Sequence, residues 1–211
     1  MTKNFFGLNV LTIFAGAGIL LLSACAPQNV ITHVNQRPIF HPSLISYAAR
    51  DGAVPLEIHG ALPAGMTAAE LAKAVHLPGR AEGVRLITAP GSDRAAPASH
   101  NTAAAILDDR FKTMLGSEGR DFRIVLVSYP HFQTLPEQAC REASEIPSEA
   151  GGDVRFMAVF CIGRHEAASG QVRIPAPHTS SKGITDAINL LLIDMSHPQP
   201  DGGMESGSRR H

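Results

Sequence analysis

The sequence has no tryptophan, few other aromatic residues and no excess of charge of either sign. Eighteen Lys and Arg stand against nineteen Asp and Glu in 211 residues, so the formal net charge is −1. A chain with this balance has no surplus positive charge to displace counterions from a nucleic acid. The nine Phe and two Tyr also leave few rings on which bases stack. The composition therefore argues against a nucleic-acid partner.

Motifs for common enzyme chemistry are also missing from the sequence. There is no GxSxG nucleophile elbow, no HExxH, and no glycine loop of the phosphate-binding kind after the N-terminal apolar segment. The ten histidines are scattered, and no two lie at i, i+4 spacing in a predicted helix, so we expect isolated surface or loop residues. The sequence thus predicts no cofactor and no metal site.

Charge is scarce at the N-terminus, where Lys3 is the single Lys, Arg, Asp or Glu before Arg37. An apolar run of 18 residues, Phe5–Leu22, follows Lys3 and leads into small residues. A basic start, an apolar stretch and small residues are typical of a secretory signal peptide. The alternative is a retained membrane helix, for which 18 residues are near the lower limit of length.

The end of this segment, Leu22-Ser23-Ala24-Cys25, resembles the lipobox of bacterial lipoproteins at every position. The resemblance implies cleavage after Ala24, a diacylglycerol on the sulfur of Cys25 and a further acyl chain on the new N-terminus. Several acyl chains anchor a protein stably, whereas one chain holds it marginally. Ala26 replaces the Asp of inner-membrane retention signals. The resemblance therefore implies attachment to the periplasmic face of the outer membrane.

The other two cysteines, Cys140 and Cys161, form an even pair. In an oxidising periplasm such a pair favours a disulfide, and the alternative is two buried free thiols. A bond between them closes a loop of about 22 residues and contributes roughly 3 kcal/mol in the chain-entropy description.

The pattern of apolar residues predicts one α+β domain over residues 53–196. Continuous apolar runs at 122–129 and 154–161 predict two central strands. Shorter strands are expected at 54–59, at 84–88 and, as an edge strand, at 171–174, and helices at 67–77, 102–115, 137–143 and 181–195. This order favours a two-layer sandwich with a mixed or antiparallel sheet and helices on one face.

The segments outside this domain are predicted to have separate roles. Residues 1–24 are the expected signal peptide, 25–52 a tether, and 197–211 a disordered tail rich in Gly, Pro and Ser. A flexible tether of this length has a mean end-to-end distance of roughly 30 Å.

Two arginines, Arg123 and Arg155, open the two central strands at equivalent places. If the strands are neighbours, two guanidinium groups on one rim suit a carboxylate or a phosphate ligand. The alternative is ordinary ion pairing with Asp121 and Asp153, each two residues earlier.

The strand order, with a proline-rich, cysteine-bearing link between the central strands, resembles small envelope lipoproteins of Gram-negative bacteria and implies no particular activity. The favoured hypothesis is a lipid-anchored periplasmic lipoprotein with a non-enzymatic binding or scaffolding domain for an unidentified protein. The alternative is a lipid-anchored periplasmic hydrolase whose site is assembled from loops.

Overall fold

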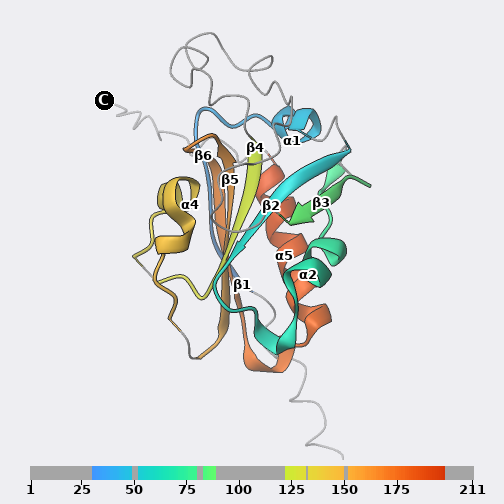
Figure 1. Cartoon of the computed structure of the whole chain (residues 1–211), viewed down its shortest axis with the longest axis vertical. Coiled ribbons are helices and arrows are strands. Elements are labelled where there is room, and N and C mark those ends of the chain that lie inside the picture. The colour runs from blue at the N-terminus through green and yellow to red at the C-terminus, as the bar shows by residue number, and fades with distance from the viewer. Residues whose placement is uncertain are drawn as a thin grey trace, which may run out of the picture.

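The centre of the molecule is a mixed six-stranded sheet in the order β1-β6-β5-β4-β2-β3 (Figure 1). The computed structural model describes residues 30–48, 52–79, 83–88, 122–131, 133–149 and 152–197. The strands are β1 (Val30–Gln36), β2 (Ala53–His59), β3 (Arg85–Thr88), β4 (Phe122–Ser128), β5 (Val154–Ile162) and β6 (His165–Ile174). The helices are α1 (Ser43–Ala48), α2 (Ala68–Ala74), α4 (Pro136–Glu142) and α5 (Ser181–Ser196), with short 3-10 turns η2 (Pro63–Gly65), η6 (Ala143–Glu145) and η7 (Ala176–His178). The fold is of the α+β class, as the sequence predicted.

The two central strands are β4 and β5, which the apolar runs predicted. They pair antiparallel from Phe122 opposite Ile162 to Ser128 opposite Phe156. Nearly every side chain of both strands is buried, which explains why neither strand shows an alternation of apolar and polar residues.

The larger core lies between one face of the sheet and the helices α1, α2 and α5. The strands supply the rings of Phe122, Phe156 and Phe160, all fully buried. The predicted apolar stripe of α5 faces this core, and all of its members are buried: Ile184, Ile188, Leu191, Leu192 and Met195. Gly170 of β6 permits the close approach of α5, because a Cβ there would lie 2.7 Å from Leu191 Cδ1.

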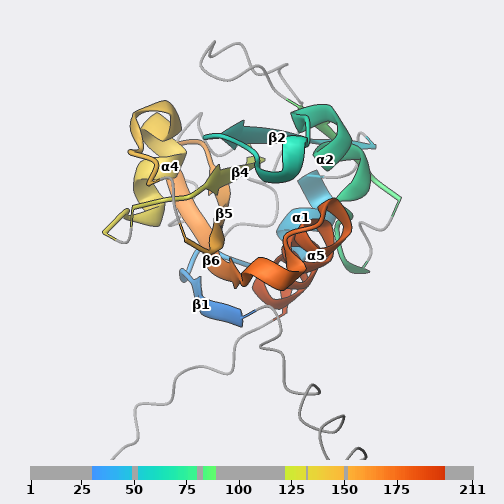
Figure 2. The same ribbon diagram turned by 90° about the horizontal axis from the view of Figure 1, so that it is seen from below.

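Helix α4 lies on the opposite face of the sheet, alone among the described helices (Figure 2). It covers a smaller apolar cluster in which Ala139 and Cys140 meet Val125, Val159 and Cys161. The prediction that all helices share one face therefore does not hold for α4. The difference follows from the link between β4 and β5, which crosses to the face on which Cys161 points.

Helix α2 begins at the capping box that the sequence predicts. The backbone N–H of Glu70 donates to the side-chain oxygen of Thr67, and the Glu70 carboxylate accepts from the backbone N–H of Thr67. The bond from the Thr67 backbone holds the pKa of Glu70 below its ordinary value. This reciprocal pair satisfies two backbone donors at the helix start.

The predicted tether spans residues 25–52, and part of it belongs to the folded body. β1 pairs antiparallel with β6, and Ile39, Leu44, Ile45 and Ala48 are buried in the larger core. The folded body thus includes residues 30–48 of the predicted tether. β1 gave little sequence signal because it is an edge strand with mostly polar, partly exposed residues.

The predicted edge strand at 171–174 is longer and more central than expected. β6 begins at His165 and lies between β1 and β5. The predicted helix at 102–115, the signal peptide and the tail beyond His197 lie outside the described residues.

Candidate functional site

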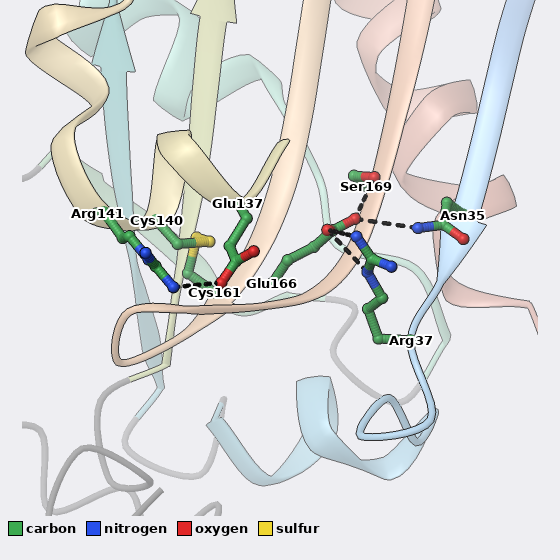
Figure 3. Close-up of polar contacts among 8 residues, drawn as sticks. All are labelled: Asn35, Arg37, Glu137, Cys140, Arg141, Cys161, Glu166 and Ser169. Atoms are coloured by element: carbon green, nitrogen blue, oxygen red, sulfur yellow. Dashed lines mark hydrogen bonds and ion pairs between the residues drawn. A yellow bond between two sulfur atoms is a disulfide. The ribbon is translucent and has the colours of Figure 1, made fainter. Parts of the chain in front are cut away.

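The disulfide Cys140–Cys161 joins α4 to β5, as the sequence predicted (Figure 3). The Cα atoms of the two residues are 5.5 Å apart, and both side chains are fully buried. The bond attaches the short helix α4 to the central strand. Charged side chains lie on both sides of the disulfide, on the strands that flank β5, and they make up the candidate site.

A β-bulge places a carboxylate next to this disulfide. Phe160 pairs with Ala168 and Cys161 with Glu166, so Ala167 has no partner on β5. Residues directly opposite each other in an antiparallel pair share a face, so the bulge puts Glu166 on the α4 face of the sheet beside Cys161.

Glu166 is almost fully buried, and its side chain is only 2% exposed. Oε1 accepts hydrogen bonds from Ser169 Oγ at 2.6 Å and from Asn35 Nδ2 at 3.2 Å. Oε2 accepts from Arg37 Nε at 2.9 Å and lies 2.8 Å from a terminal nitrogen of the same guanidinium. Figure 3 shows these groups converging on the carboxylate from β6 and the end of β1. The site therefore ties the N-terminal strand to the sheet.

A second charged group lies on the other side of the disulfide. Arg123 of β4 is directly opposite Cys161. Its Nε lies 3.0 Å from Glu57 Oε1, and its terminal nitrogens donate to the carbonyl oxygens of Gly163 and Cys140. Arg123 thus links β2, α4 and the β5–β6 turn.

His59 completes this second group, with Nε2 at 3.6 Å from Glu57 Oε2. Burial raises the pKa of Glu57, but the neighbouring His59 ring and the Arg123 guanidinium lower it by more. The net effect holds the pKa of the Glu57 carboxyl below its ordinary value, so this carboxylate is ionised at neutral pH.

The structure does not bring Arg123 and Arg155 onto a shared rim. β4 and β5 are neighbours, but they are antiparallel, so residues that open the two strands lie at opposite ends. Six residues separate Arg155 from Cys161, the partner of Arg123, which corresponds to about 20 Å along the strand.

Both arginines make ion pairs, but the partner of Arg155 is not the predicted Asp153. Arg123 pairs with Glu57, and Arg155 pairs with Glu149 at 3.3 Å. Asp153 instead pairs with Arg173 of β6, and Asp121 lies outside the described residues. For Arg155, proximity in sequence was misleading because strand side chains two residues apart share a face but lie well apart along it.

No motif in the sequence singled out Glu166, Arg37 or Glu57. The one available signal at Glu166 is a lone carboxylate in a run of small residues, Glu-Ala-Ala-Ser-Gly, which suits a buried strand better than a solvated loop. Arg37 was part of the predicted tether, and its role depends on a contact across 129 positions of sequence.

The buried charges of the site pair with one another and connect strands, and half-exposed charged side chains form the margin of this charge network. Arg37 and, on α4, the ion-paired Glu137 and Arg141 leave about half of each side chain accessible to solvent. Among the described residues, no three His, Cys, Asp or Glu side chains gather as a metal site. The described helices are all too short or too polar for a membrane span.

Comparison with known proteins gives no relative for this arrangement. No protein family, no curated protein and no solved structure matches the chain.

Proposed function

We propose that the chain is a lipid-anchored envelope lipoprotein at the periplasmic face of the outer membrane, with a domain that binds or scaffolds a partner protein. The observation that carries the proposal is Leu22-Ser23-Ala24-Cys25 at the end of an apolar run that follows Lys3. Acyl chains on Cys25 would provide the membrane affinity, at about 0.8 kcal/mol for each buried CH₂.

The disulfide supports the location of the domain. Disulfides persist in oxidising compartments such as the periplasm and are rare in the cytosol. The bond also occupies both cysteines of the domain, so Cys25 is the remaining thiol of the three in the chain.

The charge network supports binding rather than catalysis as the role of the domain. Glu166 and Glu57 each face an arginine, and these pairs connect β1 to β6 and β2 to β4. The carboxylates thus hold elements together, while Arg37, Glu137 and Arg141 at the margin remain available to a partner.

Lipid labelling of the full chain in a Gram-negative host tests the anchor. Wild-type protein is expected to incorporate radiolabelled palmitate and to sediment with membranes. Cys25→Ser is expected to lose both properties, whereas a Cys140→Ala, Cys161→Ala variant keeps the label. An unlabelled wild-type protein, or a Cys25→Ser variant that stays in the membrane fraction, contradicts the lipid anchor and favours a retained helix.

Crosslinking in intact cells tests the binding role. Wild-type protein is expected to form a defined crosslinked species that weakens when the exposed pair Glu137 and Arg141 is replaced by Gln and Ala. A crosslinking pattern that contains only the free chain contradicts a scaffolding role.

A further inference from the structure

The distance between the lipid and the folded body is short, and this fact carries an inference that rests on the proposed lipid anchor. β1 begins at Val30, five residues after Cys25. A fully extended chain of that length spans at most about 18 Å. The domain therefore has much less freedom than the roughly 30 Å tether predicted from the sequence would give.

The strand register shows which end of the sheet this short segment reaches. Val30 pairs with Arg173, which pairs in turn with Arg155, and the Tyr129 backbone N–H donates to the Arg155 carbonyl. We call this the Val30 end; its described loop residues are 60–67, 129–131, 133–135, 147–149, 152–153 and 175–180, and it is the lower end in Figure 1. The lipid on Cys25 would thus lie beside these loops.

We propose that the Val30 end rests against the lipid headgroups and that the opposite end, with the charge network, faces away from the membrane. Because the sheet is rigid, the short segment between Cys25 and Val30 restricts how the folded body is oriented relative to the membrane. The first strand is paired with β6 from Val30 to Gln36, so β1 is fixed within the body and any rotation of the body relative to the lipid is confined to the few residues between Cys25 and Val30.

The chemistry of the Val30 end suits an anionic headgroup surface. Loop 60–67 has no ionisable side chain, and the Glu70 carboxylate that follows it accepts hydrogen bonds from the backbone N–H and the hydroxyl of Thr67. The two carboxylates of the other described loop residues each have a basic partner: Glu149 has Arg155 and His131, and Asp153 has Arg173. These pairs offset the repulsion that bare carboxylates would meet at a negatively charged leaflet.

The opposite end differs in its chemistry and lies far from this surface. It carries Arg37, Arg123, Arg164 and Glu166, together with the disulfide. The nine residues of β5 separate the two ends, which corresponds to about 27 Å. In this orientation the charged margin is presented to a partner and not to the lipid.

Fluorescence quenching by spin-labelled lipids tests the orientation on full-length lipidated protein in phosphatidylethanolamine–phosphatidylglycerol vesicles. In a lipidated variant with one added cysteine, this cysteine is the single free thiol, because Cys25 carries the lipid and Cys140 and Cys161 are bonded to each other. Ser181→Cys places an environment-sensitive fluorophore at the exposed start of α5, at the Val30 end. Arg164→Cys is the matched control in the exposed β5–β6 turn at the far end.

A nitroxide in the headgroup region is expected to quench the probe at position 181 several-fold more than the probe at position 164. Insertion of about 20 Gly and Ser residues between Gln28 and Asn29 lengthens the tether to about 25 Å or more and is expected to remove most of this difference. Equal quenching, stronger quenching at 164, or a difference that survives the insertion overturns the proposal.

Mass spectrometry of the same samples separates this proposal from the lipid anchor. A chain that carries the lipid but shows no difference between the two probes overturns the orientation alone. A chain without lipid overturns both.

Discussion

At the scale of single residues, Glu166 is the one charged residue among the buried residues that the structure describes. Its side chain is 2% exposed, and its two oxygens accept hydrogen bonds from three residues of β1, β6 and the segment after β1. A buried carboxylate is tolerated only when its charge and its lone pairs are satisfied. Asn35 of β1 and Arg37 directly after it are two of the three donor residues, so the attachment of β1 and the burial of Glu166 depend on each other.

Glu166→Gln is expected to lower the free energy of unfolding by about 2 kcal/mol. The amide removes the negative charge that Arg37 faces, and its NH₂ group lies against side chains that can only donate or already donate hydrogen bonds to position 166. Urea unfolding measures the change. Glu137→Gln is the matched control, since Glu137 also pairs with an arginine at 2.6 Å but is exposed, and it should cost less than about 0.5 kcal/mol. Equal losses in the two variants would contradict a special role for the buried carboxylate.

Glu57 gives the fold a dependence on acid pH. Its pKa is lower in the folded chain than its ordinary value of 4.5, so its ionised form stabilises the fold. This contribution is present above the pKa of the unfolded chain and is lost as the pH falls through the lower, folded pKa. Wild-type protein should therefore exceed Glu57→Gln in stability at neutral pH, and the difference should shrink below pH 4.5. Urea midpoints across the acid range check this, and a constant difference would contradict it.

At the scale of elements, the disulfide compensates for the small size of α4. This helix has seven residues and contributes only two buried side chains, Ala139 and Cys140. Isolated helices of this length are not stable in water, so most of its stability must come from tertiary contacts. The bond to Cys161 and the Arg123 contact with the Cys140 carbonyl both fall on this helix.

Replacing both cysteines by alanine is expected to lower the free energy of unfolding by about 3 kcal/mol, because the bond closes a loop between positions 21 residues apart. Chemical unfolding without reductant measures the loss. Reductant should reproduce it in wild-type protein and leave the double variant unchanged. Alkylation of two thiols in unreduced, denatured domain would show that the bond is not formed.

The sequence predicted those elements whose own residues determine them. β4, β5 and α5 have long apolar patterns, and α2 has a capping box, so each was placed within a few residues. The first half of β6 was missed because His165–Gly170 is small and polar, and it becomes a strand through pairing with both neighbours. Local propensity carries little information about such a segment.

The candidate site was harder to predict than the fold. The pairing of Cys140 with Cys161 was predicted from their number after the lipobox resemblance had set Cys25 aside, with two free thiols as the alternative. Whether Arg123 and Arg155 share one rim depended on whether β4 and β5 run parallel or antiparallel, which neither run of apolar residues specifies. The face of the sheet on which Glu166 lies depended in addition on a bulge that has no signature in the sequence.

At the scale of the whole molecule, the folded body needs its N-terminal segment. Residues 30–48 supply an outer strand of the sheet and four buried apolar side chains: Ile39, Leu44, Ile45 and Ala48. Full burial of one Leu or Ile contributes about 1.5–3 kcal/mol, whereas the net stability of a domain is about 5–15 kcal/mol. Loss of this segment removes a large part of that margin and exposes the edge of β6.

A chain that begins at Ala53, the boundary predicted from the sequence, is therefore expected to be unfolded or aggregated. A chain that begins at Val30 should melt cooperatively. Circular dichroism and size-exclusion chromatography of the two fragments provide the comparison. A cooperative transition for the shorter fragment, at a temperature close to that of the longer one, would contradict the contribution of β1 and α1.

The bulge at Ala167 makes β6 unequally tolerant of insertions and deletions. Removal of this one residue would restore a regular ladder and leave Glu166 opposite Cys161, because the residue removed is the extra one of the bulge. A one-residue deletion beyond the bulge, such as that of Val172, removes a paired residue and turns the side chains on one side of the gap to the other face of the sheet. Related chains can therefore lose the residue at position 167 more easily than a residue in the regular part of the strand.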